Sequence, residues 1–232
     1  MSPKTRAIAI FGVGPGIGRA VAVQFASQGF SHLILLSRNA QRLQENKVAV
    51  MSAAGSLDIS IYTIVVDLSS QASLQAAFDH IDSLGLDLEV ALYNGARVSP
   101  TPLFETPVQE IEADFKTTTV GLYSVAKWVL PKLQIFAKAY PHANPSLIVT
   151  GGFLHKTPIP EFFTLSLVKT AQRNLVQSLH QVYNPQGVHV GLVLVGGMVS
   201  PEAKVLNPTH IAKLVWEFFE NRNDLEVELE DK

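Results

Sequence analysis

Four glycines near the N-terminus form the first group of residues whose spacing could do chemistry. Gly12, Gly14, Gly16 and Gly18 alternate with other residues between a short apolar run and a helical pattern that begins at Ile17. Glycine lets the backbone turn tightly and brings amide N–H groups close to a phosphate at the N-terminus of a helix. The spacing is Gly-x-x-x-Gly-x-Gly from Gly12 onward, which differs from the general G-x-G-x-x-G fingerprint. Its place between a strand and a helix predicts a site for the pyrophosphate of a dinucleotide.

A second candidate follows the next apolar run. Dinucleotide sites that prefer NAD carry an acidic residue about 20 residues beyond the glycines, where it binds the ribose 2′-hydroxyl. Here the run ends in Ser37, Arg38 and Asn39, with no Asp or Glu among them. An arginine can pair with a 2′-phosphate through two hydrogen bonds, whereas a carboxylate would repel it. These residues therefore predict NADP(H) rather than NAD(H), and a solvated surface arginine is the alternative interpretation of Arg38.

Positioning these residues requires strands and helices in alternation, and the chain shows this pattern from end to end. Most expected strands are solid runs of Val, Ile and Leu, as in strands covered on both faces. We expect strands at Ala7–Gly12, His32–Leu36, Ile59–Val66, Leu88–Tyr93, Leu147–Thr150, Val188–Val195 and, at an edge, Glu226–Leu229. We expect helices at Ile17–Ser27, Ala40–Ser52, Ala72–Leu84, Val108–Ala139, Pro160–Tyr183 and Thr209–Glu220. The alternation predicts a single α/β domain over residues 1–232, a doubly wound Rossmann-type fold with a parallel sheet of about seven strands and helices on both faces.

The composition narrows the class of protein. The 232 residues are 47% hydrophobic and 16% charged, which is typical of a compact globular chain. A net charge of −2 gives no broad basic field, so we expect neither nucleic acid nor a membrane as a partner. The sequence has no cysteine, which excludes disulfides and thiolate chemistry, and no His/Asp/Glu cluster has metal-ligand spacing. We expect a soluble, cytoplasmic protein that binds a small-molecule substrate and no metal.

Further motifs resemble the short-chain dehydrogenase/reductase family. Asp67 and Leu68 follow the third expected strand, where the family has its adenine-contacting aspartate. The segment Tyr93-Asn94-Gly95-Ala96 is similar to the family's Asn-Asn-Ala-Gly motif, and Gly197-Met198 stands where the family has a Pro-Gly turn. The resemblance implies an oxidoreductase that binds its cofactor through Gly12, Gly14, Gly16, Ile17, Gly18, Ser37, Arg38, Asn39, Asp67, Leu68, Asn94, Gly95, Lys169, Gly197 and Met198.

The catalytic positions that the resemblance implies are only partly filled. The family carries a Tyr-x-x-x-Lys pair on one helix, with a Ser upstream and an Asn in the preceding long helix. Lys169 fits the lysine, but Leu165 stands at the tyrosine, Gly152 at the serine and Thr118 at the asparagine. Reduction of a carbonyl puts negative charge on oxygen, and a positioned acid must deliver a proton to it. Because leucine cannot do this, we interpret the chain as an atypical member of the family.

The substrate pocket would lie beside these positions. We expect it to be lined by Arg97, Thr118, Gly152 and Leu165. His155 follows the fifth expected strand, and an imidazole can transfer protons near neutral pH. His155 and Lys169 are therefore the two candidate catalytic residues, and a surface or structural role is the alternative interpretation of each.

Three functions stay open at this point. The first is an NADP(H)-dependent reductase of an activated acceptor, such as an iminium or a conjugated alkene, which does not need the tyrosine acid. The second is a non-redox isomerase or cyclase on the same scaffold, and the third is a non-catalytic protein that binds NADPH. The resemblance also implies a homodimer or homotetramer that forms through the helices expected at Val108–Ala139 and Pro160–Tyr183.

Overall fold

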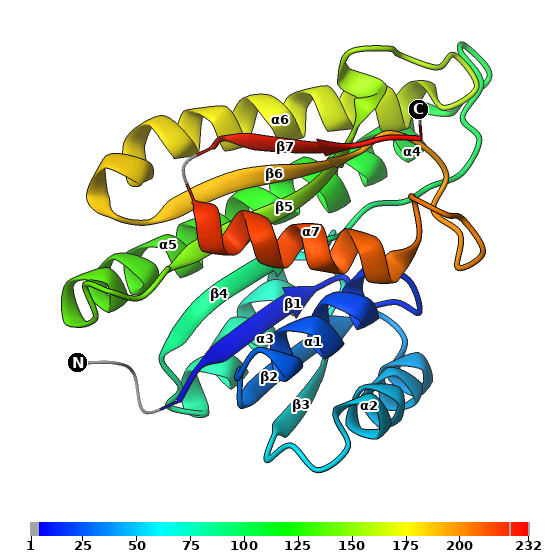
Figure 1. Ribbon diagram of the computed structural model, residues 1–232. Coiled ribbons are helices and arrows are strands. Elements are labelled where there is room, and N and C mark those ends of the chain that lie inside the picture. Colours follow the sequence, from blue (N-terminus) through cyan, green and yellow to red (C-terminus); the bar gives the residue numbers. More distant parts are fainter. Residues whose placement is uncertain (1–4, 223, 232) are drawn as a thin grey trace.

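Seven parallel strands form the centre of the molecule. The computed structural model describes residues 5–222 and 224–231, and its strands lie in the order β3-β2-β1-β4-β5-β6-β7 (Figure 1). Their bounds are Ala7–Phe11 (β1), His32–Ser37 (β2), Ser60–Val65 (β3), Leu88–Tyr93 (β4), Ser146–Gly152 (β5), His189–Val195 (β6) and Glu226–Leu229 (β7). Every neighbouring pair is parallel, and the order changes direction between β1 and β4. The predicted Rossmann-type fold is confirmed, and ligands of such sheets bind beyond the carboxyl ends of the strands at this switch point.

Helices cover both faces of the sheet (Figure 1). One face carries α1 (Ile17–Ser27), α2 (Ala40–Ala54) and α7 (Pro208–Asn221). The other face carries α3 (Gln71–Ser83), α5 (Gly121–Ala139) and α6 (Phe163–Tyr183). The short helix α4 (Val108–Phe115) precedes α5 in the chain. Within the described ranges, no helix combines the length and the hydropathy that a membrane span requires.

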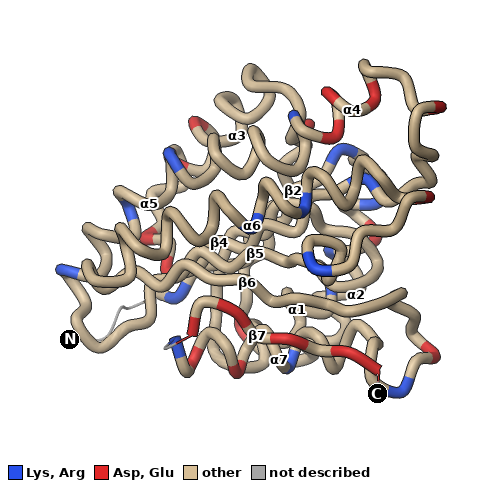
Figure 2. The backbone as a smooth tube through the Cα atoms, turned by 90° about the horizontal axis from the view of Figure 1, so that it is seen from above, with Lys and Arg blue, Asp and Glu red and all other residues tan. Residues whose placement is uncertain are grey.

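The burial of the strands follows their composition. All residues of β1, β4 and β6 are buried, because helices cover both faces of these apolar strands. β7 differs, since its glutamates alternate with apolar residues and it pairs on one side only, with β6. Figure 2 shows acidic residues along this strand. The guanidinium of Arg173 on α6 pairs with Glu226 at 2.7 Å and thereby holds the edge strand in place.

The helix expected at Val108–Ala139 is interrupted by a π turn at Lys116–Val120 that joins α4 to α5. Tertiary contacts account for the wide turn. The hydroxyl of Tyr93 donates a hydrogen bond to the carbonyl of Thr117, and burial raises the pKa of this phenol, which therefore stays a donor. A Cβ at Gly121 would lie 2.5 Å from the carbonyl oxygen of Leu68, so only glycine fits where α5 meets the sheet.

The helix expected from Pro160 begins three residues later, at Phe163. The preceding residues are held by another loop instead. The N–H of Thr101 donates to the carbonyl of Glu161 at 2.8 Å, and Phe162 forms a parallel bridge with Thr101. This pairing keeps Glu161 and Phe162 out of the helix and joins the two loops that follow β4 and β5.

Candidate active site

The glycine loop lies between the carboxyl end of β1 and the N-terminus of α1. Gly12 has a φ of +97°, and a Cβ there would lie 2.8 Å from the carbonyl carbon of Asn94. Gly18 is also confined, since its Cβ would approach the loop backbone to 3.0 Å. Gly14 and Gly16, in contrast, have nothing within 4 Å of an added Cβ. Two glycines therefore serve packing, while the other two leave open space before the N-terminus of α1, which has no side-chain cap.

A cavity of about 320 Å³ lies between the glycine loop and the N-terminus of α2. Arg38 and Arg42 line it, and no Asp or Glu of the described chain does. Asn39 caps α2, because its side-chain oxygen accepts a hydrogen bond from the N–H of Arg42 at 2.9 Å. Two guanidinium groups beside a helix N-terminus favour an anion. Sequence reasoning missed Arg42, although its place in the first turn after the asparagine cap was a usable signal.

Asp67 does not line this cavity, whose wall is formed on that side by Val66 and Leu68. Its Oδ1 accepts hydrogen bonds from the backbone N–H of Ser69 at 2.9 Å and from the Ser69 hydroxyl at 2.7 Å. Burial by itself raises the pKa of the Asp67 carboxyl, but the Ser69 hydrogen bonds and the charge of Arg38 outweigh it and lower the pKa. The carboxylate thus stays charged and shapes the turn after β3.

A larger cavity of about 690 Å³ lies on the other side of Asn94. Among its described lining residues Lys169 is the single ionisable side chain, and most of the others are apolar. Asn94 and Ala96 line both cavities, so the two form one groove across the carboxyl ends of the strands. The larger cavity is lined by Ile17, Asn94, Ala96, Val98, Thr150, Gly151, Gly152, Phe153, Leu154, Thr157, Ile159, Phe162, Leu165, Lys169, Val195, Gly196, Gly197, Met198 and Val199.

A chain of hydrogen bonds joins the glycine loop to Lys169. The amide nitrogen of Asn94 donates to the carbonyl of Gly12 at 3.0 Å, and its Oδ1 accepts from the Thr150 hydroxyl at 2.7 Å. The carbonyl of Thr150 in turn accepts a hydrogen bond from Nζ of Lys169 at 2.9 Å. These hydrogen bonds fix the positions of the glycine loop, β4, β5 and α6 relative to one another.

Lys169 is half-buried in the wall of this cavity, and its ammonium group is hydrogen-bonded to protein oxygens. Burial lowers the pKa of Lys169 to about 8, because the low-dielectric surroundings disfavour its charge. Nζ donates a second hydrogen bond to Oε1 of Gln172 at 2.8 Å. Gln172 is itself buried and donates from Nε2 to the carbonyl of Thr118 in the π turn at 3.3 Å. Sequence reasoning missed Gln172, although its place three residues after Lys169 puts both side chains on one face of the helix.

The same segments carry a match to a known family. Residues 6–210 match the family model that describes the short chain dehydrogenase, and this range includes the glycine loop, Asn94 and Lys169. The chain belongs to the short-chain dehydrogenase family. The family resemblance noted in the sequence is therefore confirmed.

Relatives of this chain include reductases from a fungus and a bacterium. The chain is 27% identical over 208 residues to the very-long-chain 3-oxoacyl-CoA reductase of Coccidioides immitis (strain RS), which covers 88% of this chain and 56% of that protein. It is 26% identical over 183 residues to the NADPH-dependent reductase BacG of Bacillus subtilis (strain 168), covering 78% and 66%. The chain spans about half the length of several curated relatives that it matches.

Solved structures share the fold over nearly the whole chain. A short-chain dehydrogenase from Rhodopseudomonas palustris superposes with a TM-score of 0.82 at 18% identity and covers 99% of this chain and 100% of that one. A short-chain dehydrogenase from Sphingobium yanoikuyae in complex with NADPH gives 0.82 at 18% identity, over 96% and 87%. At these identities the likeness establishes the fold.

Several residues expected at the site lie together in the groove. Leu165 stands one helical turn before Lys169, and both line the larger cavity with Gly152. Gly197 and Met198 form part of the opposite wall, and Met198 is 80% exposed at the rim. Among the described residues, the site thus combines a cationic end that no acidic side chain lines with an apolar end whose single ionisable lining group is Lys169.

Three residues expected in the substrate pocket or in catalysis lie outside the lining of both cavities. Arg97 pairs with the buried Asp114 at 2.7 Å and with Glu110 at 3.0 Å, because a buried carboxylate needs a cation. Thr118 is fully buried in the π turn, so its side chain cannot reach a substrate. His155 donates from Nδ1 to the carbonyl of Gly152 at 2.9 Å and does not face either cavity. Across the described residues, no group of three or more His, Asp or Glu side chains could hold a metal ion.

Proposed function

We propose that this protein is an NADP(H)-dependent reductase of an activated, apolar acceptor. The observation that carries the proposal is the groove, in which a cavity lined by two arginines meets an apolar cavity at Asn94. NADP(H) has a matching distribution of charge along its length, with the 2′-phosphate at its adenosine end, the pyrophosphate in the middle and the redox ring at the other end. Relatives of the chain support this function, since they include a 3-oxoacyl-CoA reductase and an NADPH-dependent reductase.

The residues present fit this cofactor. Gly14 and Gly16 leave room for a pyrophosphate at the N-terminus of α1, where the helix dipole favours negative charge. Arg38 and Arg42 would pair with the 2′-phosphate. Nζ of Lys169 uses two of its three N–H donors within the protein, so the third can hold a ribose hydroxyl. The other residues expected to bind the cofactor would shape the site around these groups; they are Gly12, Ile17, Gly18, Ser37, Asn39, Leu68, Asn94, Gly95, Gly197 and Met198.

When bound, the cofactor supplies a hydride to an acceptor in the larger cavity. Leu165 and Gly152 offer no acid there, and the free N–H of Lys169 is assigned to the cofactor ribose, so the walls position the acceptor but do not protonate it. An iminium suits this environment, because hydride addition to its carbon sends the C=N electron pair to the cationic nitrogen and needs no proton. A conjugated alkene is the second candidate, with its proton taken from solvent. On this basis we infer an atypical member of the family.

Calorimetric titration with NADPH and, separately, NADH tests the cofactor. We expect NADPH to bind more tightly, and Arg38→Gln and Arg42→Gln each to weaken its binding about tenfold or more, because charge-assisted hydrogen bonds contribute about 1.5–3 kcal/mol. NADH binding should change little. Lys47→Gln is the matched control, since it removes the same charge from α2 outside the cavity. Equal affinity for both cofactors, or equal weakening by the control, contradicts the assignment.

Deuterium-labelled NADPH tests the reaction. With a cyclic iminium acceptor, we expect stereospecific transfer of the label from the cofactor to the product carbon. A product without the label contradicts hydride transfer. Turnover that continues after complete removal of cofactor points instead to an isomerase or cyclase, and NADPH binding without turnover of any acceptor points to a non-catalytic binding protein.

We also propose that two copies assemble through α5 and α6. Both helices expose apolar side chains, among them Tyr123, Ile135, Leu167 and Val182. Such residues are costly to leave in water, and a partner's helices would cover them. Sedimentation of the wild type and of an Ile135→Lys variant tests this, and a wild-type monomer contradicts it.

A further inference from the structure

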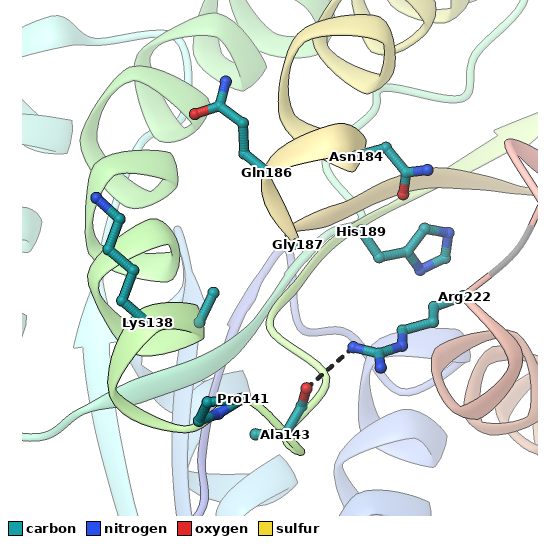
Figure 3. Close-up of a pocket in the computed structure, with 9 residues that line it drawn as sticks. Lys138, Pro141, Ala143, Asn184, Gln186, Gly187, His189 and Arg222 are labelled. Atoms are coloured by element: carbon teal, nitrogen blue, oxygen red, sulfur yellow. Dashed lines mark hydrogen bonds between the residues drawn. The ribbon is translucent and has the colours of Figure 1, made fainter.

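We infer that the protein has a second binding site, for a small oxyanion that carries its own hydroxyl group. This site lies at the end of the sheet opposite the groove, where β6 begins. A cavity of about 400 Å³ opens there (Figure 3). Its walls come from the last turn of α5, the turn after it, the start of β6 and the C-cap of α7. None of its lining residues lines the groove, so the two sites do not overlap.

The charge of this cavity is positive. Lys138 and Arg222 line it, and no Asp or Glu of the described residues does. Arg222 caps α7 in the left-handed region at a φ of 36°, and its Nη1 donates to the carbonyl of Ala143 at 3.0 Å (Figure 3). The guanidinium is thereby held at the cavity with other N–H donors left over. Within the described chain no carboxylate forms an ion pair with it, and the nearest acidic influence on the site is Asp224, whose charge acts on His189. The guanidinium is therefore available to an incoming anion.

His189 supplies the second, independent observation. It is 2% exposed, and its Nε2 donates to the carbonyl of Asp224 at 2.9 Å. Nδ1 is consequently an acceptor, yet it is buried without a hydrogen-bond partner among the described residues. Burial lowers the pKa of His189, and the charges of His180 and Arg222 lower it further. The hydrogen bond to the carbonyl of Asp224 and the charge of the Asp224 carboxylate act in the opposite direction, but the net shift is downward.

A neutral imidazole acceptor beside a guanidinium defines the ligand chemically. Figure 3 shows the ring of His189 between the side chains of Asn184 and Arg222. The ligand must offer an oxyanion to Arg222 and Lys138 and a hydroxyl donor to Nδ1 of His189. Hydrogenphosphate, a phosphate ester with a free hydroxyl, and a hydroxy acid meet both conditions, whereas sulfate lacks the donor.

Inorganic phosphate is the probe for this site. The full chain, with isotope-labelled histidine, is titrated with phosphate or sulfate while the His189 imidazole signals are followed by NMR. We expect phosphate to shift the His189 signals and to bind at least tenfold more tightly than sulfate. Because the signal is local, phosphate bound at the glycine loop does not mimic the result.

Charge variants complete the test. Arg222→Gln should weaken phosphate binding about tenfold or more, and Lys138→Gln should weaken it to a smaller degree. Lys127→Gln is the matched control, because it removes the same charge from α5 outside the cavity. The inference is overturned if phosphate leaves the His189 signals unchanged, if sulfate binds as well as phosphate, or if the control weakens binding as much as Lys138→Gln. Should Arg222→Gln not fold, Lys138→Gln decides.

Discussion

Nζ of Lys169 lies 2.8 Å from Oε1 of Gln172, and the other end of the same amide donates to the carbonyl of Thr118. The buried side chain of Gln172 therefore connects Lys169, in the wall of the apolar cavity, to the π turn between α4 and α5. The amide orients Lys169 by accepting from its ammonium, and it donates to a carbonyl of the wide turn.

Two substitutions at Gln172 should move the pKa of Lys169 in opposite directions. Gln172→Glu places a negative charge beside the ammonium and should raise the pKa above that of the wild type, whereas Gln172→Leu removes an acceptor and should lower it. The leucine variant should also lose about 1–3 kcal/mol of stability, because the carbonyl of Thr118 loses its donor. Titration of a carbon-labelled lysine by NMR measures the pKa. Shifts of the same sign in both variants contradict the positioning role.

Burial of Lys169 should make stability depend on pH. In the folded protein its pKa is about 8, and in the unfolded chain lysine titrates near about 10.4. Between these values the unfolded chain binds more protons, so this residue's contribution to stability rises with pH, by about 3 kcal/mol over the window. We expect urea unfolding from about pH 7 to about pH 10.5 to show this rise in the wild type relative to Lys169→Met. Lys127→Met, at an exposed position on α5, is the control and should follow the wild type.

Alanine at two positions of the glycine loop should separate packing from cofactor binding. Gly12→Ala should cost more than about 2 kcal/mol of stability, because a Cβ meets the Asn94 carbonyl and the backbone has a positive φ. Gly14→Ala has open space and should change stability by less than about 0.5 kcal/mol, while its methyl group weakens NADPH binding. Urea unfolding without cofactor and calorimetric titration measure the two effects. Equal losses of stability would contradict the assignment of these roles.

Restoring an acid to the larger cavity should create carbonyl reduction. Leu165→Tyr with Gly152→Ser places a phenol and a hydroxyl in its wall, and the new Cβ at position 152 would lie 3.3 Å from the Val195 carbonyl, which a small shift accommodates. We expect NADPH-dependent reduction of an apolar ketone to rise about 10²-fold, the scale of general acid catalysis. Leu165→Phe with Gly152→Ser has the same bulk without the phenol and should show no gain. A similar gain in both variants would assign the effect to shape rather than to the acid.

The sequence predicts those features that local patterns encode. The apolar runs of β1, β2 and β4 and the glycines before α1 depend on neighbouring residues, and the structure contains them at nearly the expected positions. The sequence also predicts the position of β7, because its glutamates alternate with apolar residues as in a strand with one exposed side. The structure places β7 at the edge of the sheet.

Features that depend on distant contacts differ from the expectation. The π turn needs Tyr93 and Gln172, which lie on other elements, so the run Val108–Ala139 resembles one long helix. Arg97 follows the Asn94 motif and suits a pocket mouth, yet the buried Asp114 draws its guanidinium to α4. A periodicity of apolar residues carries no information about such pairings.

The π turn also makes the fold sensitive to the number of residues between α4 and α5. It accommodates one residue more than an α-helical turn, and each residue of an α-helix rotates the chain by about 100°. Deleting one residue between Lys116 and Val120 would rotate α4 relative to α5 and carry Asp114 away from Arg97. The same deletion would displace the carbonyl that Gln172 holds. We therefore expect the fold to tolerate a substitution between Lys116 and Val120 better than the deletion of one residue there.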